Sequence, residues 1–286
     1  MASARYTIGI SVSSPPEQEL IALGLSEHHI RHVFIELVRH VLASGWDVAY
    51  GGDLRPAGYT EALFDLVHTY NRRDVAGPER VRSYLHWPVW AGLTPKDRAD
   101  LANVATLVEV SATSGVDVSD GRMRDDPPTI ARSVEAMRSR MTAEIDARVV
   151  LGGRTSGQRG IVPGVVDEAH LAIAGGLPVF VAGGFGGAAR LVAEALRGES
   201  PHELTSDFQR EHTPDYDGLG PAGNASAVLA SVVERLQRAG LPGLQNGLED
   251  DENARLMDTD DADEVVALVL RGVRRLTGAA ASPPEQ

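Results

Sequence analysis

The sequence predicts an α/β protein in which helices cover both faces of a parallel sheet. Short apolar runs rich in β-branched residues alternate with amphipathic segments of ten or more residues along the chain. Three of these runs end in a glycine pair, and a segment with helical spacing follows each of them. Strands and helices that alternate in this way are typical of βαβ units, so we expect a Rossmann-like sheet.

Both halves of the chain contribute to this pattern. In the first half we expect strand 6–12, helix 26–44, strand 46–50, helix 60–71, strand 106–110 and helix 128–145. Ser26 and Thr60 are expected to cap their helices, because a hydroxyl oxygen accepts a proton from a first-turn amide. In the second half we expect strand 147–151, helix 164–175, strand 177–182, helix 187–196 and the closing helices 222–238 and 262–276.

One domain accounts for the whole pattern. We expect it to span residues 1–277, with a core over about 5–200 and C-terminal helices over 222–277, and we expect 278–286 to be a disordered tail. The segment 77–93 is irregular and contains two of the three tryptophans. It is expected to be either a lid-like insertion or an edge strand with its loop.

The net charge of −13 is concentrated in one segment. Residues 249–264 contain nine acidic side chains and one basic side chain, so they carry −8, and the remainder of the chain carries −5. We expect this segment to be a solvated loop that leads into the last helix, with a partner-binding segment as the alternative. The chain has no basic cluster, which argues against nucleic acid as a partner.

Cysteine content and hydropathy narrow the choice further. The chain contains no cysteine, which excludes disulfides, thiolate metal sites and cysteine nucleophiles. The uncharged window 171–189 contains too many glycines for a membrane-spanning helix. The N-terminal apolar run is too short for a signal peptide. We therefore expect a cytoplasmic protein with no membrane partner.

The glycine pairs lie in segments 49–55, 150–154 and 181–187, where three strands are expected to end. Ligands bind beyond the carboxyl ends of parallel strands, where glycine lets the backbone approach them and the next helix offers free amides. Arg55 and Arg154 follow two of these turns, and a guanidinium group matches the geometry of phosphate. The alternative is that these glycines only permit tight turns. The residues expected to bind a ligand are Ser11, Ser13, Gly51, Gly52, Asp53, Arg55, Thr60, Gly152, Gly153, Arg154, Gly160, Pro163, Gly164, Glu168, Gly183, Gly184, Phe185 and Gly186.

Two acidic residues stand near the start of the helix expected at 164–175. Glu168 could bind ribose hydroxyls or act as an acid or base, whereas Asp167 fits a simple interaction with the helix dipole. The motifs GxGxxG, GxxxxGK[ST] and GxSxG do not occur where they would be needed, which argues against a dinucleotide fingerprint, a P-loop NTPase and a serine hydrolase. We expect no cofactor and no metal site, because the histidines grouped on helix 26–44 have no carboxylate partner with ligand spacing, these being His28, His29, His32 and His40.

Four motifs resemble the prokaryotic branch of the SLOG superfamily in their order and spacing. They read GISVSSP, YGGDLRPAGYTEALF, VLGGRTSGQRGIVPGVVDEA and PVFVAGGFGGAA, and the resemblance spans about residues 5–200. This superfamily includes the Lonely Guy phosphoribohydrolases, DNA-processing Smf proteins and the N-terminal domain of melastatin-type TRP channels. Similar domains occur in Thoeris-type antiphage systems.

The resemblance implies a Rossmann-like fold that senses a nucleotide-derived signal such as ADP-ribose or its cyclic forms. It implies phosphates at the turns of Gly51 and Gly52 and of 152–154, Glu168 facing the ribose, and a homo-oligomer. Lonely Guy enzymes instead cleave the N-glycosidic bond of a nucleotide with a Glu and an Arg, which match Glu168 and, one position displaced, Arg138. The turn PGVVDEA lacks their Gly-Thr pair. Three functions therefore stay open: a sensor or regulator, a nucleotide N-glycosidase, and an assembly subunit without a ligand.

Overall fold

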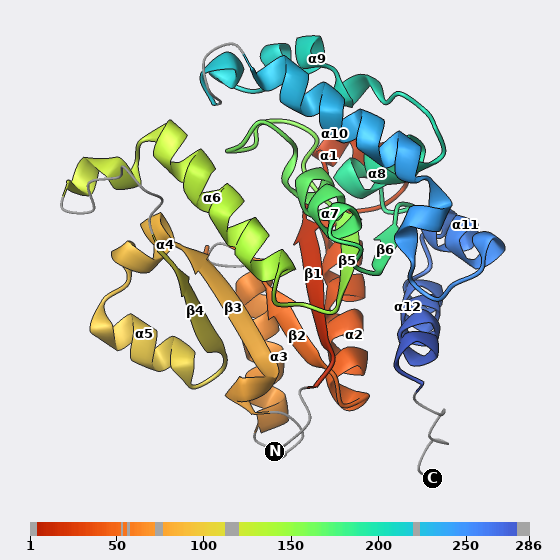
Figure 1. Ribbon diagram of the computed structural model, residues 1–286. Helices are drawn as coiled ribbons and strands as arrows, with labels where there is room; N and C mark the ends of the chain where they lie inside the picture. The colour runs from red at the N-terminus through yellow and green to blue at the C-terminus, as the bar shows by residue number, and fades with distance from the viewer. Residues whose placement is uncertain are drawn as a thin grey trace.

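The computed structural model contains one six-stranded, fully parallel sheet (Figure 1). It describes residues 5–52, 54–55, 58–71, 77–111, 120–219 and 224–278. The strands are β1 Thr7–Ser13, β2 Asp47–Tyr50, β3 Val81–His86, β4 Thr106–Val110, β5 Ala147–Gly152 and β6 Val179–Ala182. Their order across the sheet is β4-β3-β2-β1-β5-β6. The α/β fold predicted from the sequence is confirmed.

Helices lie between and after the strands. Their bounds are α1 Glu17–Ala22, α2 Glu27–Ala43, α3 Tyr59–Asn71, α4 Trp87–Gly92, α5 Pro95–Ala102, α6 Pro127–Thr142, α7 Gly164–Ala174, α8 Gly187–Leu196, α9 Ser206–His212, α10 Ala225–Ala239, α11 Asp250–Asp258 and α12 Ala262–Thr277. Ser26 caps α2 as predicted, in a capping box with His29. The expected helices 187–196 and 262–276 correspond closely to α8 and α12.

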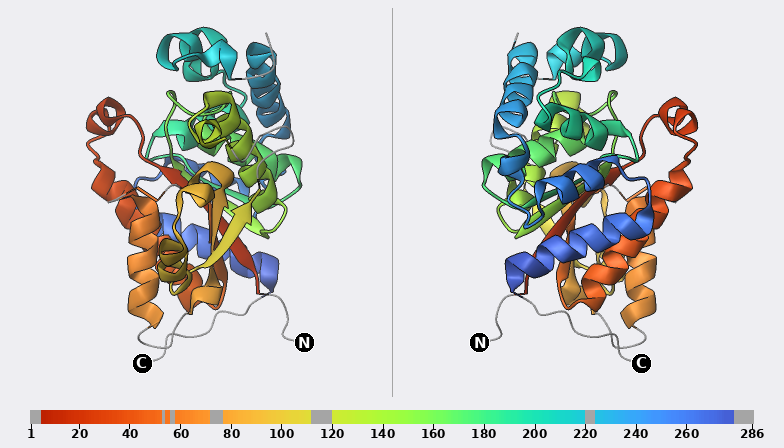
Figure 2. Two further views of the ribbon diagram at one scale, coloured as in Figure 1. Left: turned by 90° about the vertical axis from the view of Figure 1, so that its left-hand side faces the viewer. Right: turned by 90° about the vertical axis from the view of Figure 1, so that its right-hand side faces the viewer.

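The two faces of the sheet carry different groups of helices (Figure 2). Helices α2, α3 and α12 pack on one face, and α6, α7 and α8 pack on the other, with α10 outside α7 and α8. Alternate residues of β5 show the division: Val149 and Leu151 join the core under α2 and α12, whereas Val150 joins the core under α7 and α8. Side chains alternate between the faces of a strand, so Arg148 points to the same face as Val150.

The segment 77–93 is neither a lid nor an edge strand. Its β3 pairs with β2 on one side and β4 on the other, so β4 is the edge of the sheet. Tyr84 and Leu85 are fully buried there, and Trp87 begins the short helix α4. The strand reads VRSYLH, and its polar residues Arg82, Ser83 and His86 interrupt the apolar run that would have marked it in the sequence.

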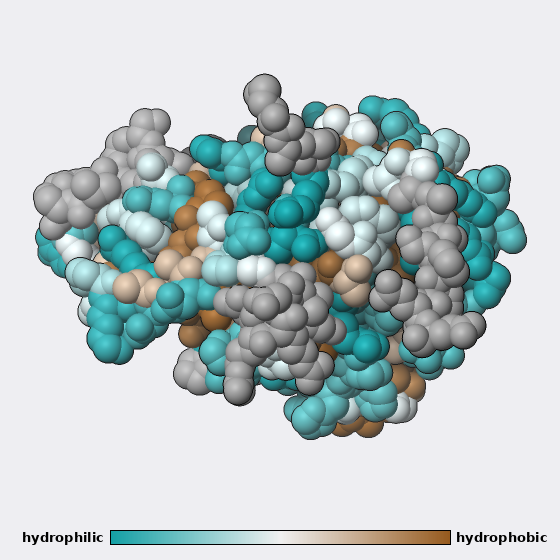
Figure 3. Space-filling model, turned by 90° about the horizontal axis from the view of Figure 1, so that it is seen from below, coloured by the Kyte–Doolittle hydropathy of each residue, from teal (hydrophilic) through white to brown (hydrophobic). Residues whose placement is uncertain are grey.

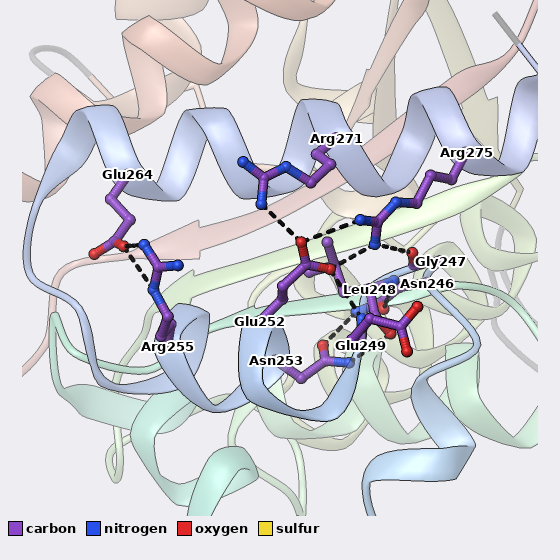
Figure 4. Close-up of polar contacts among 10 residues, drawn as sticks. All are labelled: Asn246, Gly247, Leu248, Glu249, Glu252, Asn253, Arg255, Glu264, Arg271 and Arg275. Carbon is purple, nitrogen blue, oxygen red and sulfur yellow. Dashed lines mark hydrogen bonds and ion pairs between the residues drawn. The ribbon is translucent and has the colours of Figure 1, made fainter.

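The prediction of a solvated loop at 249–264 is wrong, because most of this acidic segment is helix α11. A capping box of Glu249 and Glu252 begins the helix, and Leu256 and Met257 are buried against the sheet. Figure 4 shows the Glu252 carboxylate between two cations of α12: Arg271 Nη1 lies 2.7 Å from Oε1, and Arg275 Nη1 lies 2.5 Å from Oε2. The Arg275 hydrogen bond, followed by the Glu249 amide, lowers the pKa of Glu252 to about 2.

The outer surface agrees with the composition of the chain. Among the helices of the described ranges, none is both long and apolar enough to cross a membrane. Seen from below, the surface is mostly hydrophilic and interrupted by small hydrophobic areas (Figure 3). The expected tail lies outside the described residues, apart from Gly278.

Candidate functional site

The order in which the chain adds strands to the sheet reverses between β1 and β5, and a cleft lies at this switch point. Strands β2, β3 and β4 extend to one side of β1, and β5 and β6 to the other. The carboxyl ends of strands at such a switch point leave a crevice that ligands occupy. The cleft has a volume of about 460 Å³ and is lined by the end of β1 and the residues after β2 and β5, together with parts of α2, α3, α6 and α7.

The cleft contains several groups that can bind an anion. Gly164 and Val165, the first residues of α7, line it, and the preceding residue Pro163 has no side-chain group to cap the helix. The first amides of an α-helix have no acceptor within the helix, so this end of α7 offers donors to an anion. Arg154 lines the same cleft, as do Arg55 and Arg138. This arrangement suits a phosphate group.

Glu168 lies in the cleft wall within a network of two arginines. Its Oε2 accepts a hydrogen bond from Arg148 Nη1 at 3.1 Å, and its Oε1 lies 3.6 Å from Arg138 Nε. Arg138 also donates from Nη1 to Asp167 Oδ2 at 2.9 Å. The two sequence candidates Glu168 and Arg138 are therefore in contact, and Asp167 is the second counter-charge of Arg138.

Arg148 is the central residue of this network, and sequence reasoning missed it. Its side chain is 0 % exposed and donates to Ser11 Oγ at 2.7 Å and to Thr142 Oγ1 at 2.9 Å, besides Glu168. Burial lowers the pKa of Arg148, and the nearby Glu168 charge acts in the opposite direction. The signal was present in the sequence: an arginine inside the apolar strand ARVVL must meet a buried acceptor.

The turn after β2 belongs to the cleft. Gly51 and Gly52 line it, as do Ser13 and Ser14 at the end of β1. Ser14 Oγ donates to Glu27 Oε1 at 2.8 Å and lies 3.1 Å from the Tyr59 hydroxyl.

Two further expected ligand-binding residues, Asp53 and Thr60, follow this turn in the sequence. Asp53 lies outside the described residues. Thr60 is buried in the first turn of α3.

The turn after β5 is packed into the protein rather than open to the cleft. Gly152 and Gly153 are buried and have positive φ angles of 57° and 101°. A Cβ on Gly153 would lie 2.7 Å from a methyl carbon of Val165. The Gly153 amide donates a hydrogen bond to Ser13 O at 2.6 Å. Gly153 therefore allows a close approach of β5, α7 and α8, and only the next residue of this turn, Arg154, borders the cleft.

The turn after β6 is directed toward α11. A Cβ on Gly183 would lie 2.6 Å from Met257 O, and one on Gly184 would lie 2.2 Å from Thr259 O. Phe185 is 1 % exposed and belongs to the core under α2 and α12. Gly186 lies against Glu19 and Leu23 of the α1 region. The structure thus separates Gly183, Gly184, Phe185 and Gly186 from the candidate site.

Two other expected ligand contacts have neighbours within the protein. The Ser11 hydroxyl is occupied by Arg148, as described above. Gly160 borders a second cavity of about 440 Å³ that lies across Arg138 from the cleft. Asp167 also lines this second cavity, together with apolar residues such as Ile161 and Val228.

The histidines of α2 have structural neighbours. His29 accepts the Ser26 amide hydrogen in the capping box, and His40 lies 3.8 Å from Glu36. Across the described part of the chain, no three His, Cys, Asp or Glu side chains come together as metal ligands would.

Comparison with known proteins gave one family. A search of the curated proteins gave no match. The family model described as SLOG cluster 2 matches residues 2–256, which include every residue of the cleft and its Glu168 network. Membership of this superfamily indicates a nucleotide-related ligand or glycosidase-like chemistry. The parallel sheet, the switch-point cleft and this match together show that the chain belongs to the SLOG superfamily, in its cluster 2.

Proposed function

We propose that the cleft binds a nucleotide-derived small molecule and that the protein acts as a sensor or regulator of that molecule. The observation that carries the proposal is the meeting of the uncapped α7 N-terminus, Arg138 and Arg154 with Glu168 in one cleft at the sheet's switch point. The volume of about 460 Å³ is in the range of small-molecule sites. ADP-ribose, cyclic ADP-ribose and related NAD-derived nucleotides are the ligands we favour.

The charges of the cleft suggest how such a ligand would be oriented. Phosphate oxygens are acceptors, so they fit the α7 amides and the guanidinium of Arg154. Ribose hydroxyls are donors, so they fit the carboxylates of Glu168 and Glu27, which both line the cleft. The tyrosine rings of Tyr50 and Tyr59 are also in the wall and offer apolar surface.

Titration calorimetry of the purified protein tests this proposal. ADP-ribose, cyclic ADP-ribose, NAD and AMP would each be titrated at up to millimolar concentration, with adenosine as a control that lacks phosphate. We expect at least one phosphate-bearing compound to bind and adenosine to bind more weakly. If all four fail to bind, the proposal is wrong.

A nucleotide N-glycosidase is the second candidate, and the position of Glu168 favours it. A carboxylate in the wall of an anion-binding cleft is placed to stabilise an oxocarbenium-like ribosyl centre as its base departs. The α7 turn, which reads PGVVDEA, lacks the Gly-Thr pair of the Lonely Guy motif. Chromatography of AMP after long incubation measures this activity: base release that stops in Glu168→Gln supports an enzyme, and intact AMP supports a binding protein.

Assembly is a separate prediction. The resemblance to the superfamily implies a homo-oligomer, and sedimentation of the purified chain with and without ADP-ribose measures its mass. An assembly subunit without a ligand would show partners in a pull-down but no heat in any of the titrations.

A further inference from the structure

Arg148 occupies an unusual position, because the side chain is completely buried beside a cleft that it does not line. It comes from the middle of β5, and its three acceptors come from three other elements: Ser11 from β1, Thr142 from α6 and Glu168 from α7. Its Nε meets no hydrogen-bond partner among the described residues. One guanidinium group on β5 therefore contacts β1, the end of α6 and the α7 residue in the cleft wall.

A buried guanidinium group requires a counter-charge. Moving an ion out of water costs several kcal/mol, and arginine does not escape this cost by losing its proton. Ser11 and Thr142 are neutral, so they orient the group without balancing its charge. The carboxylate in contact with it is Glu168, through Oε2. The other oxygen, Oε1, is on the side of Arg138, which lines the cleft.

We infer that Arg148 is a positioning residue, which fixes Glu168 as a negatively charged acceptor in the cleft wall. One oxygen of the carboxylate is used to balance the buried guanidinium, and the other is presented to the ligand. Held in this way, Glu168 accepts hydrogen bonds from ligand hydroxyls. This inference rests on the proposed ligand site and adds to it the role of a residue that does not line the cleft.

The matched control for this inference is a second buried arginine, which directly precedes β3. Arg80 is 7 % exposed and donates from Nε to Asp47 Oδ1 at 2.5 Å and from Nη2 to Trp46 O at 2.6 Å. Asp47 is the first residue of β2, so this pair lies at the amino ends of the strands, away from the cleft. Arg80→Met removes a buried ion pair from the same fold without touching the candidate site.

The first measurement is binding of ADP-ribose by calorimetry in Arg148→Met, Glu168→Gln, the double variant and Arg80→Met. Loss of a charge-assisted contact predicts a dissociation constant that is roughly ten- to hundredfold higher in Arg148→Met and in Glu168→Gln. If Arg148 acts through Glu168, the double variant binds no more weakly than either single variant. Arg148→Lys restores part of the affinity, and Arg80→Met binds as the unchanged protein does. Additive losses, or an unchanged affinity in Arg148→Met, would overturn the inference.

The second measurement requires no ligand, so it stands even if the proposed function fails. The urea midpoint is compared in the same four variants, with Thr142→Val as a mild substitute if Arg148→Met does not fold. Arg148→Met is expected to lower the midpoint strongly, and adding Glu168→Gln is expected to lower it little further, because the counter-charge is then no longer needed. Strictly additive midpoints would refute the contact, whereas absence of ADP-ribose binding in the unchanged protein would refute the proposed function alone.

Discussion

Within the described ranges, two clusters bring one glutamate together with two arginines, and they differ in what surrounds them. In the first, Glu168 contacts Arg138 and Arg148 in the wall of a cleft. In the second, Glu252 of α11 contacts Arg271 and Arg275 of α12 (Figure 4). The first joins elements around a cavity, whereas the second joins two consecutive helices at the end of the chain.

The clusters differ in the burial of their arginines, because the glutamate side chain is 10 % exposed in the first and 9 % exposed in the second. In the first cluster Arg148 is completely buried, and Glu168 borders the cavity. In the second cluster both arginine side chains are more than 40 % exposed. Glu252 additionally accepts the Glu249 amide hydrogen at 3.0 Å, and Arg275 donates to Gly247 O at 2.9 Å. The second cluster is thus completed by the local backbone, which is the arrangement expected of a structural clamp.

The comparison shows that the residue types alone do not identify a site. Both clusters have one carboxylate and two guanidinium groups, but the first has a cavity at its carboxylate and an uncapped helix beside it, whereas the helix of the second begins with a capping box. We therefore expect substitutions in the first cluster to change ligand binding, and substitutions in the second to change stability alone.

Removal of the Glu168 side chain should have the largest effect. Glu168→Ala leaves Arg148 buried without its counter-charge, and breaking a buried pair in this way costs about 3–5 kcal/mol of unfolding free energy. Equilibrium unfolding in urea measures the loss. Glu168→Gln, which retains an acceptor for Arg148, should lose less, and an equal loss in both variants would mean that charge is unimportant there.

Arg154→Ala should weaken ligand binding with little change in stability. The side chain is exposed and borders the cleft, so its removal leaves no buried group unpaired. Loss of a charge-assisted bond to phosphate predicts a loss of about 1.5–3 kcal/mol in binding free energy, measured by titration of ADP-ribose. Arg274→Ala on α12 is the control. An unchanged dissociation constant would place Arg154 outside the ligand site.

Gly184→Ala should destabilise the protein and leave ligand binding unchanged. The added Cβ would meet Thr259 O at 2.2 Å, so the turn after β6 and the end of α11 must separate. Overpacking of this kind costs about 1–3 kcal/mol, measurable as a lower urea midpoint. The same substitution at Gly92 is the control, because its φ angle is not positive either and the added carbon would meet no neighbour within 4 Å. A loss of ADP-ribose affinity in Gly184→Ala would return this turn to the ligand site.

The Glu252 cluster should make the free energy of unfolding depend on pH in the acid range. The pKa of Glu252 is lowered from 4.5 to about 2 in the folded protein, so protonation favours the unfolded chain. Its contribution is complete above about pH 4.5 and is lost as the pH falls toward 2. Urea midpoints of the unchanged protein and of Glu252→Gln should therefore differ at pH 6 and converge toward pH 3. A constant difference across this range would contradict the assignment.

The sequence was sufficient for the elements whose signals are local. The β-branched run before SSPP became β1, the periodic segment after Ser26 became α2, and the run before the second glycine pair became β5. Hydrophobic periodicity and caps depend on residues within a few positions of one another, so they can be recognised without the fold. The same reasoning failed at 249–264, where counting charges concealed the buried positions Leu256 and Met257.

The ligand site shows the limit of local reasoning. The three glycine turns look alike in the sequence, but one lines the cleft, one is packed between α7 and α8, and one meets α11. Which turn faces the ligand depends on the order of the strands, which brings β1 beside β5 across more than a hundred residues.

The sequence by itself determined the alternating strands and helices, the place of Glu168 at the start of a helix and the family to which the chain belongs. Only the tertiary structure decided that Glu168 meets Arg148, that Ser11 serves this arginine rather than the cleft, and that the acidic segment is a helix clamped to α12. The physical reason is that a secondary-structure signal is set by neighbours along the chain. The partner of a buried charge is set by the register of the sheet and the packing of the helices on it.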